Sequence, residues 1–171
     1  LCSDKLFIAA NNYSGEHNTS FRVVRYGNVV GSRGSVVPLF KRIRETTRIY
    51  PITDLRMTRF WITLDRAVEL VLSAIVAPYG GSIFVPKIPS MTIAGLVAAI
   101  DPEAAIQQIG IRAGEKIHET LISSSEVPYT HEFKEYYEIR DEDGLNGLPE
   151  FGYRSETNTE WLTAADIAKL L

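Results

Sequence analysis

Residues 21–35 read FRVVRYGNVVGSRGS, so a short apolar segment passes directly into a turn that is rich in glycine and serine. The two consecutive valines predict a buried parallel strand within residues 21–26. We expect a helix over residues 36–44 after the turn, with Ser35 as its N-cap. A strand that leads into a helix through such a turn is the repeating step of an α/β fold.

The rest of the chain continues this alternation. Helices are predicted over residues 1–12, 63–75, 92–100 and 115–122 and near the C-terminus, and strands over residues 49–52, 82–86 and 106–111. Thr163 and Asp166 have the spacing of a capping box for the last helix. Residues 53–59 form a basic loop, and residues 123–150 are expected to be a surface excursion without function. The alternation indicates βαβ units in a parallel sheet, where ligands lie beyond the carboxyl ends of the strands.

The composition is that of a globular domain, or a piece of one, that binds a small molecule. Of the 171 residues 45% are hydrophobic, and 18 basic against 21 acidic side chains leave a net charge of -3, which argues against a general nucleic-acid surface. No apolar stretch is long enough to cross a bilayer, no signal-peptide pattern is present, and a lone cysteine fits a reducing cytoplasm. The cysteine and the histidines show no metal-ligand spacing, so no metal site is expected; they are Cys2, His17, His118 and His131.

The first candidate site is the turn at residues 25–35. Its glycines permit close backbone approach to a ligand, Asn28 offers an amide, and Arg33 offers a planar guanidinium that suits phosphate. Together these groups suit a nucleotide. An ordinary strand-to-helix turn with a solvated arginine has the same composition, and spacing alone leaves both interpretations open.

The second candidate site follows the strand expected at residues 49–52. It consists of Thr53, Asp54, Arg56, Thr58 and Arg59, followed directly by Phe60 and Trp61. Two guanidinium groups beside an aromatic pair can bind a diphosphate and stack on a ring. The alternative is an ion pair between Asp54 and an arginine, with Trp61 simply buried in the core.

The third candidate site is formed by Arg112, Gly114 and Glu115. A cation at a strand end and a carboxylate in the first turn of the following helix can hold a phosphate and ribose hydroxyls. The helix dipole alone would also favour a glutamate there. The neighbouring His118 and Glu119 are interpreted as structural, because adjacent helix residues point in different directions and no partner is visible in the sequence.

Five blocks of the sequence together resemble one family. They are LCSDKLF at 1–7, RYGNVVGSRGSVVP at 25–38, ITDLRMTRFWIT at 52–63, FVPKIPSM at 84–91 and GIRAGEKIHE at 110–119. With these blocks the chain resembles the inverting UDP-N-acetylglucosamine 4,6-dehydratases of pseudaminic acid biosynthesis, which are extended short-chain dehydrogenase/reductases. The match runs almost end to end, is weakest at residues 123–150 and returns at residues 158–162.

The resemblance implies the C-terminal part of an NAD(P)-binding, Rossmann-type α/β fold with a small substrate-binding lobe. Residues 1–48 and 60–86 would belong to the Rossmann domain, and residues 49–59 and 87–171 to the lobe. The family's Gly-rich NADP loop and its Tyr-x-x-x-Lys pair have no counterpart in these 171 residues, and the family's lysine directly precedes the position of Leu1. No catalytic residue is therefore assigned, and the chain by itself is expected to be inactive.

The resemblance also implies roles for residues inside the three candidate sites. Contact with the cofactor is implied for Val29, Val30, Gly31, Ser32 and Arg33. Substrate binding is implied for Asn28, Val36, Thr53, Arg59, Arg112 and Glu115. Arg56 has no such support.

The implied reaction is an intramolecular redox dehydration of UDP-N-acetylglucosamine with NADP, which inverts C5 and gives a 4-keto-6-deoxy sugar for a surface polysaccharide or a flagellin glycan. The implied partners are this nucleotide sugar and further copies of the chain in a homo-oligomer, without nucleic acid or membrane. Two rival hypotheses stay open. One is a 4-epimerase or a retaining dehydratase of the same fold, and the other is a nucleotide-sugar-binding module without catalysis.

Overall fold

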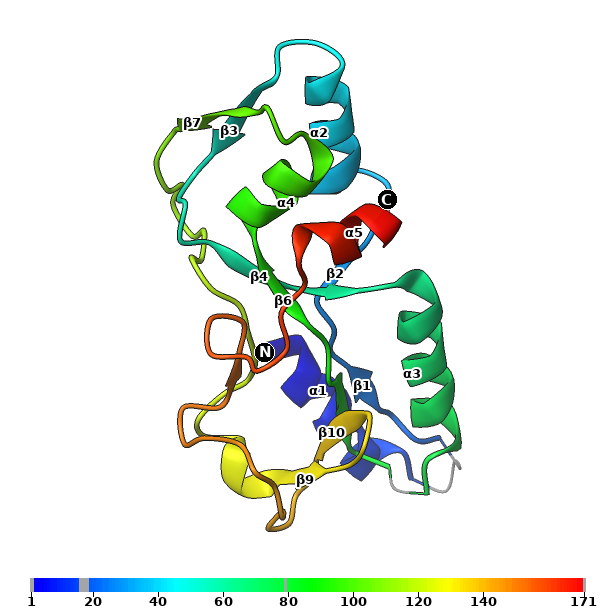
Figure 1. Cartoon of the computed structure of the whole chain (residues 1–171). Helices are drawn as coiled ribbons and strands as arrows, with labels where there is room; N and C mark the ends of the chain where they lie inside the picture. Colours follow the sequence, from blue (N-terminus) through cyan, green and yellow to red (C-terminus); the bar gives the residue numbers. More distant parts are fainter. Residues whose placement is uncertain (1, 16–18, 79, 171) are drawn as a thin grey trace. The chain divides into compact units, whose positions relative to one another are not determined.

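The computed structural model describes residues 2–15, 19–78 and 80–170, which form two compact units whose elements are labelled in Figure 1. The first unit comprises Leu1–Tyr26, Asp65–Lys87 and Thr120–Tyr153, and the second comprises Gly27–Leu64, Ile88–Glu119 and Arg154–Leu171. Leu1 and His17, which entered the sequence analysis, lie outside the described residues.

The first unit is built on a four-stranded sheet in the order β1-β5-β10-β9. β1 (Val23–Val24) lies parallel to β5 (Ile83–Pro86), while β10 (Tyr136–Ile139) and β9 (Thr130–Glu132) continue the sheet antiparallel. Every residue of β5 is buried, because the strand has a neighbour on both sides and Phe84 packs against Leu70 and Ala74 of α3 (Leu64–Val76). The other elements are α1 (Cys2–Ala10), η1 (Asn11–Tyr13), β8 (Thr120–Ile122) and η2 (Val127–Tyr129). β11 (Tyr153–Arg154) spans the boundary between the units.

The second unit contains all of the predicted ligand-binding residues. In its three-stranded sheet, β2 (Asn28–Val29) is parallel to β4 (Thr58–Ile62), and β6 (Ser90–Thr92) is antiparallel to β4. β3 (Ile49–Ile52) and β7 (Ala105–Gln108) form a parallel pair. The helices are α2 (Val36–Arg44), α4 (Ile93–Ile100) and α5 (Ala164–Leu170), and α4 and α5 lie next to each other in Figure 1. The core joins the three helices to Tyr50, Ile52, Trp61 and Met91.

Side-chain hydrogen bonds cap the N-termini of α4 and α5 in this unit. Thr92 caps α4 by accepting a hydrogen bond from the Gly95 amide at 2.9 Å. Thr163 and Asp166 form the predicted capping box, since each side chain accepts from the backbone amide of the other, at 3.2 and 3.0 Å. Ser35 occupies the predicted N-cap of α2, but its side chain makes no capping hydrogen bond.

The α/β class is confirmed, but three local predictions are wrong. No helix forms over residues 115–122: Gly114 turns the backbone with a φ of 80°, and β8 begins at Thr120. Thr58 and Arg59, expected in a loop, open β4. Residues 123–150 hold β9 and β10, so the supposed surface excursion supplies half of a sheet. The sheets are therefore mixed, because β10 and β6 both add antiparallel neighbours to strands that also have parallel ones.

Candidate functional site

Thr53, Arg112 and Glu115 come together at one polar turn. The Glu115 amide donates to the Arg112 carbonyl at 3.0 Å and closes the turn. One carboxylate oxygen of Glu115 accepts from the Arg112 amide at 3.2 Å, and the other accepts from the Thr53 hydroxyl at 3.2 Å. The carboxylate and hydroxyl are therefore oriented together, in a way that suits binding of ribose hydroxyls.

The side chain of Arg112 lies at the surface of this turn. Its guanidinium forms no hydrogen bond or ion pair with any residue in the described part of the chain. A solvent-exposed guanidinium beside an oriented carboxylate and hydroxyl can bind a phosphate group with its planar fork.

Arg59 joins the same turn through its backbone. Nη1 of Arg59 donates to the carbonyls of Ile117 at 2.9 Å and Thr58 at 2.8 Å, and Nη2 donates to the carbonyl of Lys116 at 2.9 Å. Nε lies 3.5 Å from a carboxylate oxygen of Glu119, and the side chain is 13% exposed. The guanidinium thus binds the segment that directly follows Glu115.

A chain of buried hydroxyls holds the far end of this segment. The Thr58 hydroxyl lies 2.8 Å from Nδ1 of His118 and 2.7 Å from the Ser155 hydroxyl, and the latter accepts from the Glu119 amide at 2.9 Å. The structural interpretation of His118 and Glu119 agrees with these contacts, although they lie in a loop and not in a helix.

The glycine turn forms the second part of the candidate site. Asn28 is paired with Trp61 across the parallel strands β2 and β4, so its side chain is expected on the same face as Trp61 and Arg59. Gly31 and Gly34 have φ values of 73° and 78°, with open space where a Cβ would lie. Residues 31–34 are exposed, and no side-chain contact joins them to the Thr53–Glu115 turn within the described residues.

The residues that flank this turn are more buried. Val30 and Val36 pack against the core of the second unit, and the Val30 amide donates to the Ile62 carbonyl at 2.9 Å. The Ser35 hydroxyl is buried and has no hydrogen-bond partner among the described residues. The first turn of α2 therefore keeps an unsatisfied polar atom next to an exposed glycine loop.

Several residues of the first two candidate sites have structural roles. Gly27 lets two strands approach closely, because a Cβ there would lie 2.5 Å from Cβ of Phe60. Arg56 pairs with Asp54 at 2.7 Å and, through its hydrogen bonds, lowers the pKa of that carboxyl to about 2. Trp61 is buried in the core. The alternative interpretation of the second cluster is thus confirmed for Asp54, Arg56 and Trp61.

Arg25, grouped with the glycine turn in the sequence, belongs to the first unit and is a partly buried ion-pair centre. It lies 2.7 Å from Asp4 and 2.8 Å from Glu126, and it also donates to the Leu121 carbonyl at 3.0 Å. Burial by itself raises the pKa of Glu126, but hydrogen bonds from Arg25 and Ser123 outweigh it and lower that pKa. The partners of Arg25 are distant in the sequence, so no local sequence pattern could indicate them.

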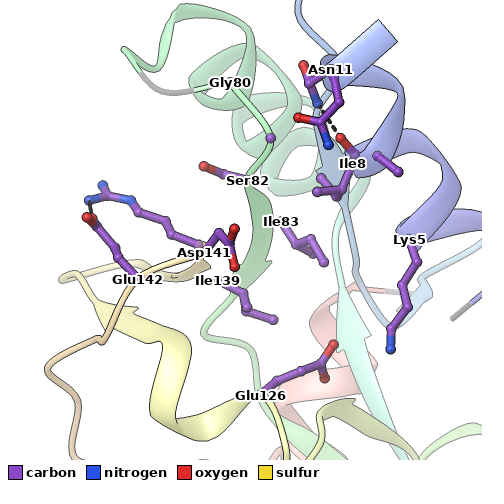
Figure 2. Close-up of a pocket in the computed structure, with 14 residues that line it drawn as sticks. Lys5, Ile8, Asn11, Gly80, Ser82, Ile83, Glu126, Ile139, Asp141 and Glu142 are labelled. Carbon is purple, nitrogen blue, oxygen red and sulfur yellow. Dashed lines mark hydrogen bonds and ion pairs between the residues drawn. The ribbon is translucent and has the colours of Figure 1, made fainter.

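A cavity of about 620 Å³ in the first unit was not predicted from the sequence. Figure 2 shows Lys5, Ile8 and Asn11 on one side of it and Asp141 and Glu142 on the other. None of the predicted ligand-binding residues line it. Its charged groups are of both signs, and Glu126 is already engaged with Arg25.

The described residues contain neither a metal-binding cluster nor a membrane-spanning helix. Among them no group of three or more His, Cys, Asp or Glu side chains has a metal-binding arrangement. No helix in residues 2–15, 19–78 and 80–170 is both long enough and apolar enough to span a membrane.

Comparison with known proteins shows that this chain is similar to nucleotide-sugar enzymes. The family described as polysaccharide biosynthesis protein matches residues 1–141. A UDP-N-acetylglucosamine 4,6-dehydratase (inverting) of Campylobacter jejuni is 48% identical over 100% of the chain and 57% of its own length. A UDP-glucose 4-epimerase of Rickettsia conorii is 41% identical over 80% of the chain and 41% of its own length.

A solved structure supports the same relationship. Pen from Bacillus thuringiensis superposes with a TM-score of 0.85 at 30% identity, over 98% of the chain and 54% of Pen. The chain spans about half the length of the relatives it matches. These similarities confirm the family resemblance found in the sequence blocks.

Proposed function

The chain belongs to the polysaccharide biosynthesis protein family, and we propose that it is the substrate-binding part of an NADP-dependent, C5-inverting UDP-N-acetylglucosamine 4,6-dehydratase. The observation that carries this proposal is the exposed guanidinium of Arg112 beside the hydrogen-bonded pair of Glu115 and Thr53. In this proposal Arg112 neutralises the diphosphate, and Glu115 and Thr53 hold the ribose hydroxyls. Asn28 orients the sugar, and Val36 and Arg59 complete the substrate site.

The glycine turn suits the cofactor of such an enzyme. Exposed backbone around Gly31 and Gly34 and the unsatisfied hydroxyl of Ser35 at the start of α2 are features that a phosphate-bearing ligand can use. Val29, Val30, Gly31, Ser32 and Arg33 would hold it. NADP, when bound, supplies a hydride acceptor. The residues of this chain bind and orient, and the proton-transfer groups of the family have no counterpart in these 171 residues.

Cellular location, oligomeric state, product and domain assignment are parts of the same proposal. The enzyme acts in the cytoplasm as a homo-oligomer and supplies a 4-keto-6-deoxy sugar for pseudaminic acid. In the whole enzyme, residues 1–48 and 60–86 belong to the Rossmann domain and residues 49–59 and 87–171 to the substrate lobe.

A 4-epimerase is the second candidate, because a Rickettsia epimerase is also similar over most of the chain. The reaction products separate the two: a dehydratase releases water from UDP-N-acetylglucosamine, whereas an epimerase leaves its mass unchanged. Mass spectrometry of the nucleotide sugar after incubation with the whole enzyme and NADP therefore decides between them.

Substrate binding is tested with Arg112→Lys, which keeps the charge but loses the planar fork. We expect UDP binding to weaken by about 1–3 kcal/mol, the usual value of a charge-assisted hydrogen bond. Isothermal titration with UDP measures this. Arg56→Lys is the matched control, because Arg56 is exposed and already paired with Asp54. If Arg112→Lys binds UDP as tightly as the parent, the diphosphate assignment is wrong.

A further inference from the structure

The segment of residues 109–119 carries Arg112 and Glu115 and contains no helix or strand. Its start is fixed where β7 ends, because the Ile109 amide donates to the Ile52 carbonyl at 2.9 Å. A segment without regular secondary structure needs other partners for its amides and carbonyls. The contacts at its far end therefore decide how firmly the two ligand-binding side chains are placed.

Thr58 and Ser155 together hold the far end of this segment. The Thr58 amide donates to the Ile117 carbonyl at 3.1 Å, and the Thr58 hydroxyl lies 2.8 Å from Nδ1 of His118. Ser155 and Glu119 are bonded in both directions. The Ser155 amide donates to the Glu119 carbonyl at 2.9 Å, and the Ser155 hydroxyl accepts from the Glu119 amide at 2.9 Å. Two residues thus bind three consecutive residues of the segment.

The hydroxyls of Thr58 and Ser155 also contact each other inside the second unit. The two residues are 4% and 0% exposed, and their hydroxyl oxygens lie 2.7 Å apart. A buried polar group that loses its partner costs the free energy of its desolvation, which exceeds the net contribution of the bond. The arrangement is therefore sensitive to the loss of either hydroxyl.

We infer that Ser155 is a positioning residue of the substrate site: with Thr58 it fixes the end of residues 109–119 and thereby the place of Glu115 and Arg112. The inference rests on the proposed function of this site. Ser155 acts through the segment and does not touch the ligand, because it is fully buried.

The connection from the buried serine to the ligand-binding groups is short. Only residues 116–118 separate Glu119 from Glu115. Glu115 is bonded to Arg112 twice, since its amide donates to the Arg112 carbonyl and its carboxylate accepts from the Arg112 amide. A displacement of Glu119 is therefore expected to move both ligand-binding residues together.

Ser155→Ala tests this role, because it removes only the hydroxyl. Ser90→Ala is the matched control: Ser90 is also 0% exposed, and its hydroxyl accepts from the Asn158 side chain at 3.0 Å. Two measurements are made on the 171-residue chain. The first is hydrogen exchange of single amides in residues 109–119, with residues 93–100 of α4 as the reference. The second is the affinity for UDP and for uridine, each followed by titration.

A positioning role predicts a specific pattern in Ser155→Ala. The amides of Glu119, Glu115 and Arg112 exchange about tenfold faster relative to α4, as expected for a buried hydrogen bond that is lost. UDP and uridine each bind about fivefold more weakly, because both use the ribose contact of Glu115. Ser90→Ala changes neither measurement, although it too removes a buried hydroxyl.

A pair of changes at Thr58 tests the same arrangement from its other member. Thr58→Val replaces the hydroxyl by a methyl group and should give the pattern of Ser155→Ala. Thr58→Ser keeps the hydroxyl and should retain the exchange rates and affinities of the parent. A loss of affinity in Thr58→Ser as large as that in Thr58→Val would show that packing, and not the hydroxyl, places the segment.

Other patterns overturn the inference. Faster exchange confined to the Glu119 amide shows that the lost bond acts only locally. Faster exchange throughout the segment with unchanged affinity shows that its position does not matter for binding. An equal loss of affinity in Ser155→Ala and Ser90→Ala indicates general destabilisation. If the parent chain binds neither UDP nor uridine, the proposed function fails, and exchange at Arg112 and Glu115 still decides whether Ser155 holds the segment.

Discussion

At the scale of single residues, the neighbours of a side chain decide its role more than its chemical type does. Arg112 and Arg59 carry the same group, but the first faces solvent and the second binds backbone carbonyls. Arg25 is the third case, enclosed by carboxylates of Asp4 and Glu126. Of these three arginines, Arg112 is the one whose guanidinium has no partner among the described residues.

Gly27 provides a residue-scale prediction about stability. A methyl group at this position would lie within 2.5 Å of both Cβ and the carbonyl oxygen of Phe60, and the backbone of β4 cannot yield without breaking its pairs. We expect Gly27→Ala to lower the free energy of unfolding by about 1–3 kcal/mol, the usual cost of overpacking. Denaturant unfolding of the purified chain measures it.

Gly31→Ala is the control for this prediction. There the added methyl group meets open space, and only the φ of 73° opposes it, at a cost of about 1–2 kcal/mol. Gly27→Ala should therefore be the more damaging change. The opposite order would show that β2 and β4 are not held as closely as described.

At the scale of elements, one carboxylate connects the end of α4 to β3. Asp101, 1% exposed, accepts from Nε of Arg48 at 2.9 Å and from the Tyr50 hydroxyl at 3.3 Å. Hydrogen bonds from Arg48 are the largest cause that lowers the pKa of Asp101 to about 2. Arg48 itself has a φ of 53°, a conformation that non-glycine residues rarely adopt, so its side-chain contacts help to maintain the turn before β3.

The lowered pKa of Asp101 predicts a pH dependence of the second unit. A carboxyl whose folded pKa lies below its unfolded value contributes stability that is complete above the unfolded pKa, near 3.8, and is lost as the pH falls towards about 2. Asp101→Asn should lower the free energy of unfolding at neutral pH. It should also reduce the further loss of stability between about pH 4 and 2. Unfolding midpoints measured across this range test it.

Tyr50→Phe is the control, because it removes the longer contact and leaves the Arg48 pair in place. It should keep most of the pH dependence. If Asp101→Asn and the parent lose stability in parallel below pH 4, the ion pair does not act as described.

At the scale of the whole molecule, the chain exposes apolar surface that a stable soluble domain would normally cover. Val68, Leu72 and Ile75 of α3 are 49%, 57% and 63% exposed and share one helix face. The buried face of the same helix is occupied by Leu70 and Ala74. α3 is thus apolar on two sides, which is typical of a helix with a second neighbour.

This surface predicts that the 171-residue chain associates with itself. Sedimentation velocity over a range of concentrations should show a rising mean mass, because apolar faces of this kind are buried on contact. Replacing Leu72 by Lys and Ile75 by Glu should shift the distribution towards the monomer. Leu145→Lys, at an exposed leucine outside α3, is the matched control and should have no such effect. A parent chain that stays monomeric at every concentration contradicts the prediction.

Local patterns in the sequence by themselves determined the α/β class, the bounds of α2 and β3 and the capping box of Thr163 and Asp166. Helix caps and apolar periodicity act over a few residues, so a short window contains all of the information. In the glycine turn, Gly31 and Gly34 adopt positive φ values, which glycine allows without steric cost.

Only the tertiary structure decided what depends on partners distant in the chain. Residues 115–122 have an acceptable helical composition, but Arg59 and Thr58 bind their polar groups in an extended loop. β10 has no clear period in the sequence and becomes a strand because β5 offers it an edge to pair with. The physical reason is the same in both cases: contacts between residues 50 to 60 positions apart stabilise a conformation that a short window of sequence does not specify.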